Sequence, residues 1–162
     1  MVIWIVGLSG AGKTFAAKYL KRQMQAKYKK KIIHVDGDQF RNITSNDLGY
    51  DLKNRKTNSL RIQNFCKYLE EEGFIVICSI LSIFSEHRKK NRKIFKKYKE
   101  IFINCSIESI LNRDKRRIYK KKTNVVGKHF KFIPPKTSDH IINNDGSKKK
   151  LFSSLDKLLK KI

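Results

Sequence analysis

The chain alternates short, continuous apolar runs with longer stretches in which apolar residues recur at helical spacing. The short runs lie at 2–6, 31–35, 74–78, 101–105 and 140–143. Uninterrupted hydrophobicity over so few residues is typical of strands that are buried on both faces of a parallel sheet. We therefore predict five strands at these positions.

The stretches between the runs carry the apolar spacing of helices. They predict helices over 13–28, 54–72, 85–99, 106–116 and from 147 onward, with a short helix and a loop over 39–53. Strands that alternate with helices form a parallel sheet with right-handed crossovers. Residues 117–138 form a loop long enough to need a function, and a lid is the usual one. We predict one α/β domain over 1–162 in three α/β/α layers, with a lid at about 117–138.

A glycine-rich motif directly follows the first predicted strand. Residues 7–14 read G-L-S-G-A-G-K-T and match the phosphate-loop pattern G-x-x-x-x-G-K-[ST] at each specified position. Glycines let backbone N–H groups approach phosphate oxygens, and the following helix adds the positive end of its dipole. We expect Lys13 to reach the β- and γ-phosphates of ATP and the Thr14 hydroxyl to ligate Mg²⁺. The predicted fold is that of the P-loop NTPases, and the motif's expected ATP-binding residues are Gly7, Ser9, Gly10, Ala11, Gly12, Lys13 and Thr14.

The charge is strongly unbalanced, with 38 Lys and Arg against 14 Asp and Glu and a formal net charge of +24. A charge of this size can form a basic surface that attracts nucleic acid or anionic substrates. The alternative is that the lysines and arginines only cover the solvent-exposed faces of helices. The basic residues are spread through 27–31, 89–99, 115–122 and 148–161 without a recognisable nucleic-acid module. The pattern favours solvated faces and a nucleotide substrate, and it does not favour a nucleic-acid partner.

The remaining composition bears on the compartment. No apolar run reaches the roughly 18 residues of a membrane span, and no basic region precedes the first apolar run. Cys66, Cys78 and Cys105 form no C-x-x-C pair, so buried thiols in a reducing cytoplasm are the simplest interpretation. We expect neither a membrane partner nor a metal site built from cysteine or histidine.

Two carboxylates, Asp36 and Asp38, follow the second predicted strand. Ligands of open α/β sheets bind at the carboxyl ends of the strands. We expect Asp36 to be the base that takes the proton of an acceptor hydroxyl, and Asp38 to hold Mg²⁺ waters or to assist. Together with Lys13 these are the predicted catalytic residues. The alternative, a capping or turn role, is nearly as strong for Asp38.

The class of phosphate-loop protein follows from length and missing motifs. A switch GTPase carries D-x-x-G and N-K-x-D motifs, and no convincing pair occurs in the right order. The short chain favours a nucleotide or metabolite kinase. Arg41, Arg55 and Arg61 can grip an anionic acceptor, although in so basic a chain each can also be a solvated surface charge.

Several linked segments resemble the adenylylsulfate kinase family. That family reads G-L-S-G-x-G-K-[ST], then D-G-D-x-x-R, then D-L-G-F, with similar gaps between the motifs. The resemblance covers nearly the whole chain, and the matching segments are 7–14, 36–41, 46–50, 55–61, 75–82, 113–121 and 143–145.

The resemblance implies transfer of the γ-phosphate of ATP to the ribose 3′-hydroxyl of adenosine 5′-phosphosulfate, with Mg²⁺. It implies that Arg113 binds ATP and that Tyr50, in place of the family's phenylalanine, stacks on the acceptor base. Family members are often dimers, which implies a possible homodimer. The acceptor-binding residues that it implies are Asp38, Arg41, Tyr50, Arg55, Asn58, Ser79, Ile80 and Lys120.

The chain departs from the family most clearly in the lid. The family commonly carries a Phe-Thr-Gly turn whose ring covers the adenine, whereas here residues 123–127 follow the lysines directly. Asn54 and Thr57 also replace acidic residues of the family, and Ile83 replaces a proline. The short lid is similar to relatives from surface-polysaccharide pathways, some of which phosphorylate cytidine diphosphoramidate. That acceptor is the first alternative, and a non-catalytic nucleotide-binding accessory protein is the second.

Overall fold

The protein has a five-stranded parallel sheet with the strand order β2-β3-β1-β4-β5. The computed structural model describes residues 1–28, 31–114, 118–121 and 123–162. All five predicted strands are confirmed within a few residues. Their bounds are β1 Val2–Val6, β2 Ile32–Asp36, β3 Ile75–Ser79, β4 Tyr98–Asn104 and β5 His140–Asn143. Every residue of β1 and β3 is buried, as uninterrupted apolar runs in a parallel sheet require.

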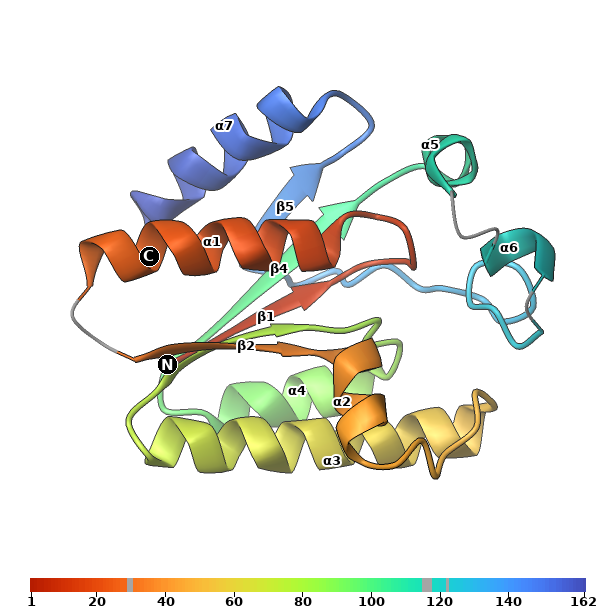
Figure 1. Ribbon diagram of the computed structural model, residues 1–162, viewed down its shortest axis with the longest axis horizontal. Helices are drawn as coiled ribbons and strands as arrows, with labels where there is room; N and C mark the ends of the chain where they lie inside the picture. Colours follow the sequence, from red (N-terminus) through yellow and green to blue (C-terminus); the bar gives the residue numbers. More distant parts are fainter. Residues whose placement is uncertain (29–30, 115–117, 122) are drawn as a thin grey trace.

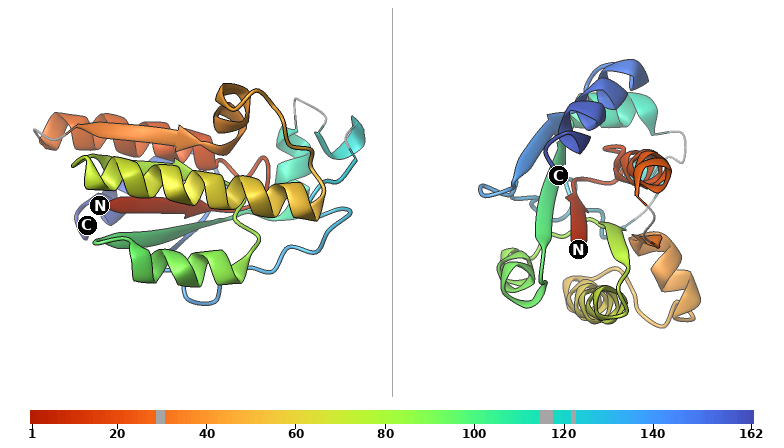
Figure 2. Two further views of the ribbon diagram at one scale, coloured as in Figure 1. Left: turned by 90° about the horizontal axis from the view of Figure 1, so that it is seen from below. Right: turned by 90° about the vertical axis from the view of Figure 1, so that its left-hand side faces the viewer.

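Helices cover both faces of this sheet, so the predicted α/β/α layers are confirmed. Helices α1 and α7 pack together on one face, and α3 and α4 lie on the other (Figures 1 and 2). The helices are α1 Lys13–Lys27, α2 Gly37–Ile43, α3 Leu52–Glu71, α4 Ser85–Ile94, α5 Ile107–Arg113, α6 Ile118–Lys121 and α7 Lys148–Leu159. None of the helices in the described parts of the chain combines the length and apolar character needed to cross a membrane.

The prediction of one helix over 85–99 is wrong at its C-terminal end. Helix α4 ends at Ile94, and β4 begins at Tyr98, which is opposite Val2 in the register of β4 against β1. The buried Phe95 ring lies 6.2 Å from Trp4 and 5.8 Å from Tyr98. Pairing with β1 and burial of these rings outweigh the local helical spacing.

The other bounds differ by small amounts. Helix α3 begins at Leu52, because the Asp51 side chain accepts from Asn54 N and caps it. Ser106 caps α5 in the same way, as predicted, and α5 ends at Arg113. The predicted end of that helix at 115–116 lies outside the described residues, as do residues 117 and 122 of the predicted lid. The described part of this predicted lid, residues 117–138, contains the short helix α6 and a bridge between Val126 and Phe130.

The polar groups predicted to act together lie at one end of the sheet. The strands β1, β2 and β3 run in the same direction, so the phosphate loop, Asp36 and Ser79 meet at their carboxyl ends. The chain termini lie at the opposite end of the sheet (Figures 1 and 2). Cys66, Cys78 and Cys105 are buried free thiols, as predicted.

Candidate active site

The phosphate loop connects β1 to α1 and is shaped by glycines that no other residue can replace without strain. A Cβ atom on Gly7 would lie 2.6 Å from the Ile103 carbonyl oxygen. Gly12 has φ +99°, and a Cβ atom there would lie 2.6 Å from Asn144 Nδ2. The same Asn144 amide donates a 2.8 Å hydrogen bond to the Ala11 carbonyl. The loop is therefore held against the ends of β4 and β5 as a backbone cradle.

The cradle is built to bind an anion. Gly12 is the N-cap of α1 and has no side chain, so the first N–H groups of α1 and its positive dipole end face the loop. Lys13 Nζ donates a 2.8 Å hydrogen bond to the Leu8 carbonyl, which holds its ammonium group over the loop. This arrangement suits the phosphates of a nucleotide.

The carboxylate of Asp36 is engaged on both oxygens. Oδ2 accepts hydrogen bonds from Thr14 Oγ1 at 2.7 Å and Ser79 Oγ at 2.9 Å. Oδ1 caps α2 by accepting from the N–H groups of Asp38 at 3.1 Å and Gln39 at 3.3 Å. Burial by itself raises the pKa of Asp36, but these four bonds outweigh it and hold the pKa below its ordinary value. Asp36 is thus a fixed, ionised group that joins the phosphate loop to β2 and β3.

A histidine that the sequence analysis missed supports this carboxylate. His34 Nε2 lies 2.8 Å from Ser79 Oγ, whose proton is donated to Asp36. The imidazole must therefore donate from Nε2, which defines its tautomer. Burial lowers the pKa of His34 below its ordinary value despite the nearby Asp36 charge, which favours the neutral ring at neutral pH. The available signal was its position two residues before Asp36, since alternate residues of a strand share one face.

Two adjoining cavities open beside these groups. The larger, of about 500 Å³, is lined by the phosphate loop, Asp36, Ser79 and residues 123–126 of the lid. The smaller, of about 70 Å³, lies between α2, α3 and the segment 80–84. The described residues that line both are Gly37, Asp38, Tyr50, Arg55, Ile80 and Leu81. Asp38 is exposed and therefore presents a carboxylate at the junction.

The smaller cavity contains most of the predicted acceptor-binding residues. The Tyr50 ring centroid lies 4.6 Å from Arg41 Cζ and 5.4 Å from Arg55 Cζ. Arg41 Nη1 also binds the carbonyls of the segment 48–49. Asn58 is 6% exposed, and its Oδ1 has no hydrogen-bond partner among the described residues. A buried amide oxygen of this kind favours a ligand that brings a donor.

Arg55 connects this cavity to the lid. Its Nε donates to the Tyr50 carbonyl at 2.7 Å, and its Nη2 donates to the Asn124 carbonyl at 2.9 Å. The lid also contacts the phosphate loop, because the Tyr119 hydroxyl donates to the Ser9 carbonyl at 3.0 Å. The lid side chains that line the larger cavity are Ile118, Thr123, Asn124, Val125 and Val126. None of these described side chains is aromatic, in agreement with the lost ring predicted from the sequence.

Some predicted residues line neither cavity. Within the phosphate loop these are Gly7 and Ala11, which are buried, and outside it they are Arg61, Arg113 and Lys120. Arg113 donates to the carbonyls of Asn144 at 2.7 Å and Gly146 at 2.8 Å, so it holds the turn whose Asn144 supports the phosphate loop. Lys120 is exposed, and neither it nor Arg113 is among the described lining residues. Arg61 pairs with Asp47 at 2.7 Å on the surface, as a solvated charge would.

The residues present fit a magnesium site completed by phosphates. No group of three or more His, Cys, Asp or Glu side chains in the described parts of the chain can hold a metal unaided. Magnesium sites in phosphoryl-transfer enzymes use few protein groups together with substrate oxygens. The Thr14 proton points to Asp36, which leaves the hydroxyl lone pairs for a cation in the larger cavity.

Comparisons with known proteins agree with this geometry. The family model described as adenylylsulphate kinase matches residues 1–142. The chain is 34% identical to a cytidine diphosphoramidate kinase of Campylobacter jejuni, over 99% of this chain and 95% of that protein. It is 33% identical to a probable adenylyl-sulfate kinase of Bacillus subtilis, over 76% of this chain and 63% of that protein.

Solved structures show the same relationship. The APS kinase of Mycobacterium tuberculosis in complex with AMPPNP and APS has a TM-score of 0.86 and 26% identity, over 98% of this chain and 96% of that one. A gluconokinase from Sinorhizobium meliloti, with a TM-score of 0.66 and 14% identity, shares the fold alone. The phosphate loop, the carboxylates after β2 and the family match together show that this chain belongs to the adenylylsulphate kinase family.

Proposed function

We propose that this protein is an ATP-dependent kinase that transfers the γ-phosphate to the ribose 3′-hydroxyl of an activated nucleotide. The observation that carries the proposal is the junction of the two cavities. The larger contains the phosphate loop, and the smaller contains the arginines and the tyrosine suited to a nucleotide acceptor. Asp38 lines both, where an acceptor hydroxyl and the terminal phosphate would meet.

On the donor side, backbone N–H groups of the phosphate loop hold the phosphates, apart from that of Ala11, which donates to the Leu8 carbonyl. Lys13 neutralises the phosphate charge. Thr14 would contribute its hydroxyl oxygen to Mg²⁺, and Asp36 orients that hydroxyl by accepting its hydrogen bond. When bound there, Mg²⁺ would neutralise part of the negative charge of the nucleotide phosphates. The neutral His34 keeps Ser79 directed at Asp36 and so preserves the alignment of Thr14.

The geometry favours Asp38 as the base, a role that the sequence analysis expected for Asp36. Asp36 already accepts four hydrogen bonds, and a carboxylate so engaged is a weak proton acceptor. Asp38 is exposed at the junction and close to both cavities. It takes the proton of the acceptor hydroxyl as the γ-phosphoryl group is transferred.

Adenosine 5′-phosphosulfate is the first candidate acceptor, because it is the acceptor that the family resemblance implies. Cytidine diphosphoramidate is the second candidate, and two observations support it. The similarity to the Campylobacter jejuni kinase extends over 99% of this chain, and no described lid residue in the cavity offers an aromatic ring for adenine. In either case Arg41 and Arg55 would supply the positive charge for the anhydride, the Tyr50 ring lines the cavity in which the base would lie, and Asn58 Oδ1 would accept from a donor on the nucleotide.

The test is turnover of both acceptors by purified protein with ATP and Mg²⁺, followed by coupled ADP release. Phosphorus NMR of the product identifies the phosphorylated hydroxyl, and a reaction without acceptor gives the ATPase background. We expect one acceptor to have a higher kcat/KM and to gain a 3′-phosphate. Failure of both acceptors in a folded protein that still binds ATP would reject the proposal and favour the non-catalytic accessory protein.

A further inference from the structure

Ser82 has an unusual backbone conformation beside the smaller cavity. It belongs to residues 80–84, which connect β3 to α4 and line that cavity; we call them the acceptor loop. Ser82 is 5% exposed and has φ +51°, in the left-handed region that residues with a Cβ seldom adopt. Such a conformation persists only where the surroundings hold it.

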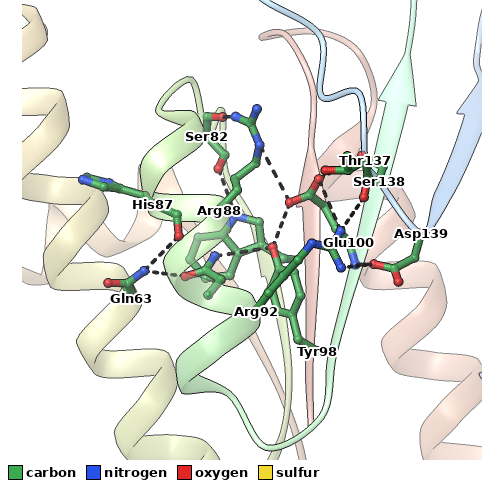
Figure 3. A network of polar contacts seen from close by, with 12 residues as sticks. Gln63, Ser82, His87, Arg88, Arg92, Tyr98, Glu100, Thr137, Ser138 and Asp139 are labelled. Atoms are coloured by element: carbon green, nitrogen blue, oxygen red, sulfur yellow. Dashed lines mark hydrogen bonds and ion pairs between the residues drawn. The ribbon is translucent and has the colours of Figure 1, made fainter.

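Two long side chains hold Ser82, one through its hydroxyl and the other through its carbonyl. Trp4 Nε1, from β1, donates a 3.0 Å hydrogen bond to Ser82 Oγ. Arg88 Nη1, from α4, donates to the Ser82 carbonyl. Figure 3 shows the Arg88 guanidinium directed at this carbonyl. Neither Trp4 nor Arg88 is among the described residues that line the cavities. Both side chains therefore affect the cavity only through their contacts with Ser82.

Arg88 needs a compensating charge, because it is only 8% exposed. Glu100 on β4 supplies it: its Oε2 lies 3.8 Å from Arg88 Nε, and the residue is 1% exposed. Glu100 is itself fixed by 2.9 Å hydrogen bonds from the Tyr98 and Ser138 hydroxyls (Figure 3). Arg88 thus joins a rigid buried carboxylate to a strained loop residue.

A second arginine of α4 touches the same carboxylate but not the loop. Arg92 Nη2 lies 4.0 Å from Glu100 Oε1, and its Nη1 lies 3.0 Å from Asp139 Oδ2. Its contacts hold the segment before β5, as Figure 3 shows. Arg92 therefore serves as a matched control for Arg88, since both share Glu100 and only Arg88 binds Ser82.

We propose that Arg88 is a positioning residue for phosphoryl transfer: held by Glu100, it keeps Ser82 in the left-handed conformation and so sets the shape of the acceptor cavity. The inference rests on the proposed function of that cavity. Both contacts use the planar fork of the guanidinium, with Nε toward Glu100 and Nη1 toward the carbonyl. A lysine has one nitrogen and cannot make both contacts in this geometry.

The first experiment compares Arg88→Lys with Arg92→Lys. We expect Arg88→Lys to raise the KM of the acceptor about tenfold or more, with the KM of ATP changed less than about twofold. Arg92→Lys should leave both constants near their original values. Adding Ser82→Gly to Arg88→Lys should restore much of the acceptor KM, because glycine adopts a positive φ without cost. Equal acceptor KM values in the two single lysine variants would overturn the inference.

The second experiment needs no turnover. Trp4 is the only tryptophan of the chain, and its indole N–H contacts Ser82, so its fluorescence reports on the acceptor loop. We expect a shifted emission maximum in Arg88→Lys and an unchanged one in Arg92→Lys. If Arg88→Lys does not fold, Glu100→Gln, which removes the charge that holds Arg88 but leaves the hydroxyl bound by Trp4 in place, carries the test with a smaller rise in acceptor KM and an emission shift in the same direction. Unchanged emission in the folded variant would refute the inference, whereas absent turnover with a shifted emission would refute only the proposed function.

Discussion

The Thr14 hydroxyl donates a 2.7 Å hydrogen bond to Asp36 Oδ2, so the first turn of α1 and the end of β2 share one carboxylate. Ser79 donates to the same oxygen from β3. Three segments distant in sequence are thereby brought into register around the larger cavity. The orientation of the Thr14 hydroxyl, which we propose as a ligand of Mg²⁺, depends on Asp36 remaining an acceptor.

Asp36→Asn is expected to reduce kcat by about 100-fold and to raise the Mg²⁺ concentration needed for half-maximal rate. The asparagine amide presents N–H donors where the carboxylate accepted four bonds, so Thr14 loses its orientation. The measurement is kcat as a function of Mg²⁺ at saturating ATP. An unchanged Mg²⁺ dependence would show that Asp36 does not contribute to Mg²⁺ binding.

Asp38→Asn is expected to lower kcat by about 100-fold to 10,000-fold while leaving ATP affinity within about twofold, because it removes the proposed base and no proposed phosphate contact. Single-turnover rates and ATP titrations measure the two effects separately. Glu86→Gln, which removes an exposed carboxylate 3.5 Å from Lys56, is the control and should leave the rate unaltered. A loss confined to ATP affinity would make Asp38 a binding residue.

His34→Leu is expected to lower kcat about tenfold with little change in either KM, because Ser79 loses the donor that keeps its own proton directed at Asp36. His34→Gln retains an N–H donor of similar reach and should recover most of the rate. Steady-state kinetics of the two variants make the comparison. Equal rates in both would assign His34 to packing alone.

His87 predicts how stability depends on pH. Its Nδ1 lies 2.9 Å from Ser59 Oγ, and burial lowers its pKa below the ordinary value of about 6.5. The unfolded chain therefore takes up a proton first as the pH falls, so the contribution is complete above about pH 6.5 and is lost below it. Urea unfolding between pH 7.5 and 5 should show a shallower loss of stability in His87→Asn than in the unaltered protein. Parallel pH profiles of the two proteins would contradict this assignment. The pKa values of His34 and His140 are also lowered, so these residues contribute to the pH dependence in the same direction.

Arg55→Lys is expected to raise the acceptor KM about tenfold and to increase hydrogen exchange in lid peptides that contain Asn124. A lysine cannot donate to the Tyr50 and Asn124 carbonyls together, so the contact between lid and acceptor side is lost. Arg61→Lys, in the surface pair with Asp47, is the control. Equal hydrogen exchange in the two variants would show that Arg55 does not hold the lid segment at Asn124.

Local pattern was sufficient for most of the architecture. The phosphate loop, the five strands and the carboxylates after β2 were all found from spacing and motif, because glycine turns and continuous apolar runs act within a few residues. The boundary between α4 and β4 was not found in this way, because Tyr98 joins the sheet through its pairing with β1. The helical spacing of apolar residues up to residue 99 gives no information about that distant partner.

By itself, the sequence determined the family, the sheet and the segment that cradles phosphate, since each depends on neighbouring residues in a recognisable order. Only the tertiary structure decided what single side chains do. It joined His34 to Ser79 and Asp36, turned Arg113 toward the turn that supports the phosphate loop, and set Arg88 behind Ser82. These contacts join elements far apart in the chain, and their partners become neighbours only when the sheet and its covering helices pack.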